Sequence, residues 1–173
     1  RKISGIFRMH IDRVFSKVGF GCVVTGTIGS GSVKIGDILE LLPSAQKVKV
    51  RSIQSHGVNV PVAYSGERAA INLNNTESNK LKRGYHLSKI NTYSEIESFI
   101  CDISLNRIKK TKIENNQRIR VHLGTREVMA RISIIKSDHD SNSKFPALIR
   151  LEKSIVAGIE DYFIIRSYSP VYT

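Results

Sequence analysis

The sequence has no tryptophan, two cysteines and four prolines among its 173 residues. So little proline, with twelve glycines, excludes a collagen-like or proline-rich chain. Cys22 and Cys101 lie far apart in the sequence and cannot by themselves form a disulfide framework or a zinc knuckle. No run approaches the roughly 18 apolar residues that a membrane-spanning helix needs. We therefore expect a soluble, cytoplasmic protein without a metal site or a membrane partner.

Acidic residues are scarce in the first half of the chain. The whole chain carries a formal charge of +12, from 27 Lys+Arg and 15 Asp+Glu. Residues 1–89 hold 14 basic and 5 acidic residues, a net charge of +9, whereas residues 90–173 hold 13 and 10, a net charge of +3. Basic residues on a surface can simply be solvated, but an excess of positive charge of this size favours a polyanionic partner. Nucleic acid is the first candidate.

Motifs for catalysis and nucleotide binding are incomplete. Gly26 and Gly31 have the spacing of a phosphate-binding loop, but Ser32-Val33 follows where Lys and Ser or Thr are required. The stretch Asn79–Lys82 begins like the guanine-reading Asn-Lys-x-Asp but ends in lysine. The five histidines have no metal-ligand spacing, and no nucleophile with a base and an orienting group can be identified. The sequence predicts no catalytic residue, no metal site and no cofactor in this chain.

The dominant hydrophobic period is two, which predicts β-strands. Phe7, Met9 and Ile11 alternate with polar residues, and Lys47–Arg51 alternates in the same way. A new alternating series begins after Ile90–Ser94, with runs at Phe99–Leu105, Ile119–Leu123, Val128–Ile134, Ala147–Leu151 and Asp161–Ser167. Glu77–Lys82 alone could form a helical turn. Short strands at near-regular spacing predict an all-β fold of two small antiparallel barrels in tandem, residues 1–90 and 91–173.

Several blocks, in order along nearly the whole chain, resemble the middle domains of translational GTPases. Those resembling the second domain of elongation factor Tu and its relatives are Ile11–Phe15, Gly19–Gly21, Val23–Thr27 and Val33–Asp37. The variants at Ile11–Phe15, Val50–Gly57 and Gly66–Leu73 are closest to the selenocysteine-specific elongation factors. Val121–Thr125 and Phe163–Pro170 resemble the third domain of that family. The resemblance implies two barrels like domains two and three of elongation factor Tu. The first barrel would bind the aminoacyl end of a tRNA and the second its acceptor and T stems.

The resemblance implies that this chain is part of a factor that binds selenocysteinyl-tRNA and delivers it to the ribosome in a GTP-dependent manner during selenoprotein synthesis. GTP and Mg would sit on a nucleotide domain preceding this chain, so the full-length protein would be a GTPase while this fragment would not be an enzyme. Domains following the chain would bind the selenoprotein mRNA hairpin. Two alternatives stay open. One is the middle domains of another elongation factor Tu-like translational GTPase, and the other is a stand-alone basic RNA-binding β-barrel protein.

The resemblance also assigns a selenocysteine pocket to Asp12, Arg13 and Arg68. A selenol is more acidic than a thiol, whose pKa is about 8.5. The selenocysteinyl side chain should therefore be an anion at neutral pH, unlike a serine hydroxyl, and guanidinium groups can separate the two by charge. The competing interpretation is an ordinary surface salt bridge. A basic loop in the second barrel could follow tRNA phosphates or simply be solvated; its residues are Lys109, Lys110 and Lys112.

Overall fold

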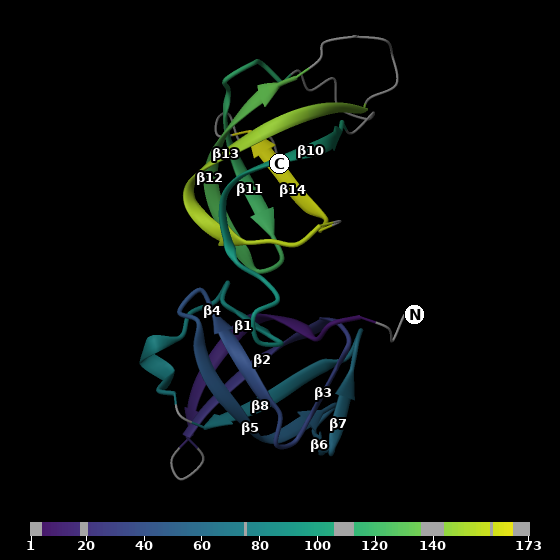
Figure 1. The fold of residues 1–173 in the computed structure, drawn as a ribbon, viewed down its shortest axis with the longest axis vertical. Helices are drawn as coiled ribbons and strands as arrows, with labels where there is room; N and C mark the ends of the chain where they lie inside the picture. The colour runs from purple at the N-terminus through teal and green to yellow at the C-terminus, as the bar shows by residue number, and fades with distance from the viewer. Residues whose placement is uncertain are drawn as a thin grey trace. The chain divides into compact units, whose positions relative to one another are not determined.

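The computed structural model describes residues 5–17, 21–74, 76–105, 113–135, 144–159 and 161–167, and it confirms the predicted all-β class (Figure 1). In these residues the only helical element is the 3-10 turn η1 (Ser78–Lys80), inside the segment expected to form a turn. The strands are β1 (Arg8–Lys17), β2 (Gly21–Ser30), β3 (Ser32–Lys34), β4 (Ile38–Leu42), β5 (Gln46–Ser55), β6 (Val58–Asn59), β7 (Val62–Tyr64), β8 (Arg68–Asn74), β9 (His86–Ser88), β10 (Glu95–Ser104), β11 (Arg118–Leu123), β12 (Arg126–Ile134), β13 (Lys144–Val156) and β14 (Phe163–Ser167).

The chain divides into two compact units. The first unit consists of Arg1–Ser94 with Gly124–Arg126 and Val156–Ile159, and the second of Glu95–Leu123, Glu127–Ile155 and Glu160–Thr173. The main change of unit falls after Ser94, next to the segment from which the sequence predicts a new domain. The assignment of residues 1–90 to the aminoacyl end and of 91–173 to the tRNA stems stays a prediction.

The first unit is a small antiparallel barrel. Its strands follow the order β4-β9-β1-β2-β8-β5, and β4 also pairs with β5, which closes the ring. The short strand β6 pairs antiparallel with the end of β5, and β3 pairs with β7 in a separate ribbon. The apolar residues of the alternating pattern fill the interior of the barrel. Phe7, Met9 and Ile11, for example, are at most 1% exposed. They pack with inward residues of the other strands, such as Val24 and Ile71. Closure removes most of the free strand edge that an open sheet would expose.

A bulge interrupts the alternation of β1. Ile11 pairs with Gly26 and Arg13 pairs with Thr25, so Asp12 is an additional residue without a partner of its own. Ile11 belongs to the core, whereas Asp12 and Arg13 are successively half-buried and exposed. A bulge places neighbouring residues on one side of a strand in this way. Two consecutive charged side chains therefore lie on the outside of the barrel.

Gly26 on β2 allows the two strands to approach closely at this bulge. A Cβ added to Gly26 would lie 2.1 Å from the carbonyl oxygen of His10. No side chain fits at that distance without a shift of the backbone, because the nearest atom belongs to the main chain of β1. The glycine of the Val23–Thr27 block thus has a structural role in seating β1 on β2.

The second unit is a curled five-stranded sheet of order β10-β13-β12-β11-β14 (Figure 1). Its predicted apolar faces are confirmed, with Ile119, Val121 and Ile132 at most 1% exposed. The rings of Phe99 and Phe163 meet edge to face, with their centroids 5.2 Å apart. The expected domain three-like barrel thus has one inward apolar face, and its other face carries the polar members of each strand.

Candidate functional site

Asp12 and Arg68 come together on the outer face of three neighbouring strands, β1, β2 and β8. The guanidinium of Arg68 forms hydrogen bonds with both oxygens of the Asp12 carboxylate: Nη2 donates to Oδ1 at 3.0 Å, and Nη1 donates to Oδ2. A bidentate pair of this kind fixes the planes of both groups. The side chain of Arg68 stays 52% exposed, so its outer surface remains open to a ligand.

Thr25 supplies a third contact to the same carboxylate. Its Oγ1 donates to Asp12 Oδ1 at 2.7 Å from the central strand β2. Partial burial alone would raise the pKa of Asp12, but the hydrogen bonds from Arg68 and Thr25 and the charges of Arg68 and Arg13 hold it below the usual value. Asp12 is therefore a fixed carboxylate at neutral pH.

Arg13 follows Asp12 on the outside of the bulge, and its positive charge contributes to the lowered pKa of Asp12. Among the described residues, Arg13 has no carboxylate within ion-pair distance, whereas Arg68 is paired. Two guanidiniums and one carboxylate leave the cluster with one net positive charge. The structure thus brings together all three residues that the sequence assigns to the pocket, and their role in binding stays a prediction.

Sequence reasoning missed Thr25 as a member of this cluster. Thr25 lies within the Val23–Thr27 block, where the alternation of β2 turns it outward. Its contact with Asp12 depends on the bulge, which no single-strand pattern reveals. Glu67, directly before Arg68, was also unassigned: its Oε2 accepts from Ser55 Oγ and from the backbone N–H of Tyr64, each at 3.3 Å. These contacts hold the turn that leads into Arg68.

Arginines gather on the outer face of the sheet in the second unit. Arg120 on β11 stands directly opposite Arg166 on β14, and Arg131 on β12 directly opposite Arg150 on β13. Like charges in such cross-strand positions destabilise a sheet. Glu152 accepts from Arg118 Nε and Nη2, each at 2.7 Å, and Glu127 lies 3.3 Å from Arg120. The sequence marks Arg118, Arg120 and His122 as the polar face of one strand but does not reveal these pairs, which depend on register.

The predicted lysine loop cannot be compared with this surface, because Lys109, Lys110 and Lys112 lie outside the described residues. In the described ranges, no helix is long and apolar enough to cross a membrane. The same part of the chain contains no group of three or more His, Cys, Asp or Glu placed to hold a metal ion.

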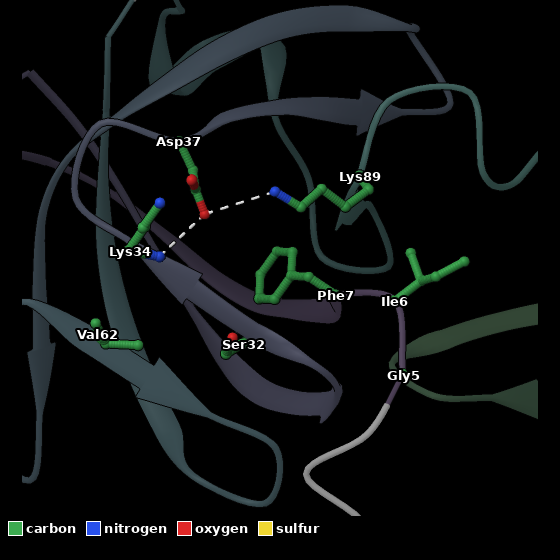
Figure 2. A pocket seen from close by; sticks show the side chains of 8 residues that line it. All are labelled: Gly5, Ile6, Phe7, Ser32, Lys34, Asp37, Val62 and Lys89. Atoms are coloured by element: carbon green, nitrogen blue, oxygen red, sulfur yellow. Dashed lines mark hydrogen bonds and ion pairs between the residues drawn. The ribbon is translucent and has the colours of Figure 1, made fainter.

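A separate cavity of about 440 Å³ opens in the first unit (Figure 2). Asp37 Oδ2 accepts from the backbone N–H of Lys34 at 3.0 Å and lies 3.8 Å from Lys89 Nζ. Two of the charged side chains of the cavity, Asp37 and Lys89, are therefore paired with each other. Its wall is formed by Gly5, Ile6, Phe7, Ser32, Lys34, Asp37, Val62 and Lys89, none of which the sequence assigns to a site.

Comparison with known proteins gives concordant matches. The family model "Elongation factor Tu domain 2" matches residues 21–88. The selenocysteine-specific elongation factor of Desulfomicrobium baculatum is 32% identical over 98% of this chain and 27% of its own length. That of Methanocaldococcus jannaschii is 32% identical over 86% of the chain and 32% of its own length. The crystal structure of apo elongation factor SelB from Methanococcus maripaludis is 26% identical and superposes with a TM-score of 0.84 over 95% of this chain and 39% of that one.

The chain spans about a third or less of the length of these two curated relatives. The matches nevertheless extend across both of its units, and the family model falls in the first. By sequence and by fold, the chain is related to the selenocysteine-specific translation elongation factors and corresponds to their middle domains two and three.

Proposed function

We propose that this chain holds the aminoacyl end of selenocysteinyl-tRNA at Asp12, Arg13 and Arg68, within a factor that delivers this tRNA to the ribosome in a GTP-dependent manner. The observation that carries the proposal is the cluster of three charged side chains on one outer face, with one guanidinium charge left unneutralised. Like charges held close together at an exposed site suit an anionic ligand.

Charge is the basis of selection in this proposal. An ionised selenolate would interact with two guanidinium groups, and a charge-assisted contact of this kind is roughly twice as strong as a neutral hydrogen bond. A serine hydroxyl, which is neutral, gains little from the same groups. Asp12 has a positioning role, because it fixes the plane of Arg68 while Arg13 retains its full charge. Thr25 fixes Asp12 in turn.

The arginines on the outer face of the second unit support the proposal that tRNA stems bind there. Arg120 with Arg166 and Arg131 with Arg150 place four guanidiniums in opposed pairs. A phosphate between two such groups relieves their repulsion, and phosphate contacts give affinity without reading sequence. This suits a factor that recognises one tRNA through its aminoacyl group and holds its stems by the backbone.

The remaining activities of the proposed factor belong to parts outside this chain. GTP, Mg and GTP hydrolysis are assigned to a separate nucleotide domain, and the selenoprotein mRNA hairpin to separate C-terminal domains. We expect no catalytic residue and no cofactor in residues 1–173 themselves. The cytoplasm is the compartment that such a function in translation requires.

The test is discrimination between two aminoacyl-tRNAs by the full-length protein. We expect Arg68→Ala to weaken selenocysteinyl-tRNA binding far more than seryl-tRNA binding, and Arg68→Lys to restore only part of it, because an ammonium lacks the planar fork. Lys80→Ala, which removes an exposed cation elsewhere in the unit, serves as the matched control. Equal losses of affinity for both tRNAs would indicate that Arg68 contacts only a phosphate. That result would favour the alternative of another elongation factor Tu-like GTPase.

A further inference from the structure

A second basic surface lies on the first unit, along the outside of β5. The residues of this β5 stripe are Lys47, Lys49 and Arg51, all exposed and alternating with the buried Val48 and Val50. Alternate residues of a strand are about 6.7 Å apart. That repeat is comparable to the spacing of successive phosphates along a nucleic-acid strand.

The charges of the β5 stripe are not neutralised by neighbouring strands. Lys49 stands opposite Ile38 on β4 and opposite Asn74 on β8, and both partners are uncharged. Glu40 stands opposite Lys47, but it is only 7% exposed and accepts from the backbone N–H of Asn91. Within the described ranges, none of the three cations forms an ion pair.

The β5 stripe is separated from the cluster of Asp12, Arg13 and Arg68. Arg51, the stripe residue nearest that cluster, lies at a register shift between Val50 and Ser52, and Ser52 pairs with Asn72 on β8. Asn72 is four residues beyond Arg68, which corresponds to about 13 Å along the strand. The intervening exposed or half-buried residues are uncharged, namely Ser52 and Gln54 on β5 and Ala70 on β8, and Asn72 is buried. No basic track therefore connects the two surfaces, and an RNA strand passing between them would be unsupported over that length.

We propose that the β5 stripe binds the backbone of a second RNA, distinct from the aminoacyl-tRNA and bound at the same time. A protein partner is disfavoured because Ile38 is the only exposed large apolar residue in register with the stripe in the described strands. A protein–protein interface needs an apolar centre. A row of three exposed cations, with a single exposed apolar side chain beside it, matches a ribose–phosphate chain. The proposal goes beyond the proposed function and depends on it only for the tRNA.

The first arm of the test measures binding of a short fluorescent oligouridylate to the full-length protein at increasing KCl concentrations. The stripe variant carries Lys47→Gln, Lys49→Gln and Arg51→Gln. We expect the slope of log affinity against log salt to fall by about 2 in this variant, since each phosphate contact on a single strand contributes about 0.7. A charge-preserving variant with Lys47→Arg, Lys49→Arg and Arg51→Lys should keep the wild-type slope.

The matched control removes three exposed lysines outside the stripe, through Lys80→Gln, Lys144→Gln and Lys153→Gln. It should keep the wild-type slope, which separates a local effect from a change of net charge. Thermal unfolding of each variant shows whether it is folded. An unchanged slope in the folded stripe variant would overturn the proposal.

The second arm repeats the titration with protein saturated by aminoacyl-tRNA. We expect oligouridylate to bind this complex, and the stripe variant to keep the wild-type affinity for the tRNA. If the stripe variant instead loses tRNA affinity, or if tRNA excludes oligouridylate, the stripe belongs to the tRNA footprint and the proposal fails. If the protein binds no tRNA at all, the proposed function fails, while the first arm still decides whether the stripe binds RNA.

Discussion

Thr25 is the neutral member of the charged cluster, and its hydroxyl holds Asp12 Oδ1 at 2.7 Å. We expect Thr25→Val to raise the pKa of Asp12 toward its usual value, because one donor to the carboxylate is lost. A hydrogen bond to a group that is partly exposed contributes roughly 1 kcal/mol to stability. Carboxylate chemical shifts followed by NMR against pH measure the change. Thr27→Val, two residues along the same strand, is the control, and an equal effect there would contradict a specific contact.

The lowered pKa of Asp12 also determines how the stability of the protein changes in acid. Stability from this carboxylate is present above the pKa of an unfolded aspartate and is lost as pH falls through the lower pKa of the folded state. Because Arg68 is half exposed, we expect the effect on stability to be small. The larger consequence is for binding, since Arg68 loses its fixed orientation when Asp12 is protonated.

His86 provides a pH dependence of the same direction for a different reason. Burial lowers its pKa to about 2, helped by the charges of His10 and Arg8, and Arg8 Nε donates to its Nδ1 at 3.3 Å. The unfolded chain takes up a proton near pH 6.5 and the folded protein does not, so stability is complete above that pH and falls below it. We expect the free energy of unfolding in urea to decrease as pH falls from neutral to mildly acidic. In the His86→Gln variant the slope of this free energy against pH should be smaller. A variant with the wild-type slope would exclude His86 as the titrating group.

At the scale of single elements, the contact between β1 and β2 depends on Gly26. A Cβ there would lie 2.1 Å from the His10 carbonyl oxygen, whereas a Cβ on Gly29 of the same strand would meet its nearest atom at 3.6 Å. We expect Gly26→Ala to destabilise the protein by about 1–3 kcal/mol, the range for overpacked sites. Gly29→Ala should cost much less. Chemical denaturation midpoints test this, and equal midpoints for the two variants would contradict the close approach.

The strands of both units could be predicted from the sequence, because period-two alternation identifies each inward face. The alternation of Ile119, Val121 and Leu123, for example, matches their burial. The bulge at Asp12 could not be predicted, since it is a mismatch between two strands rather than a property of one. For the same reason the contact of Thr25 and the opposed arginines of the second unit were missed. The placement of Asp12 and Arg68 in one site was expected only from family resemblance.

At the scale of the whole molecule, every strand of the closed barrel lies within residues 1–94. A barrel that contains its own core and its own closing pair β4–β5 should not need the second unit to fold. We therefore expect an expressed fragment 1–94 to be folded, with a cooperative thermal transition and dispersed NMR signals. A fragment that is collapsed but lacks fixed side-chain packing would show that the segments Gly124–Arg126 and Val156–Ile159 are required.

The carboxylate of Asp12 limits what the proposed pocket can bind. Any anion that approaches Arg68 meets a guanidinium already engaged at two nitrogens. A neutral group gains little from such a guanidinium, so binding has a threshold: the ligand must carry its own negative charge. A cysteine thiol, with a pKa of about 8.5, crosses that threshold only in alkaline solution. The discrimination between cysteine and selenocysteine should therefore narrow as pH rises, while the discrimination against serine should persist.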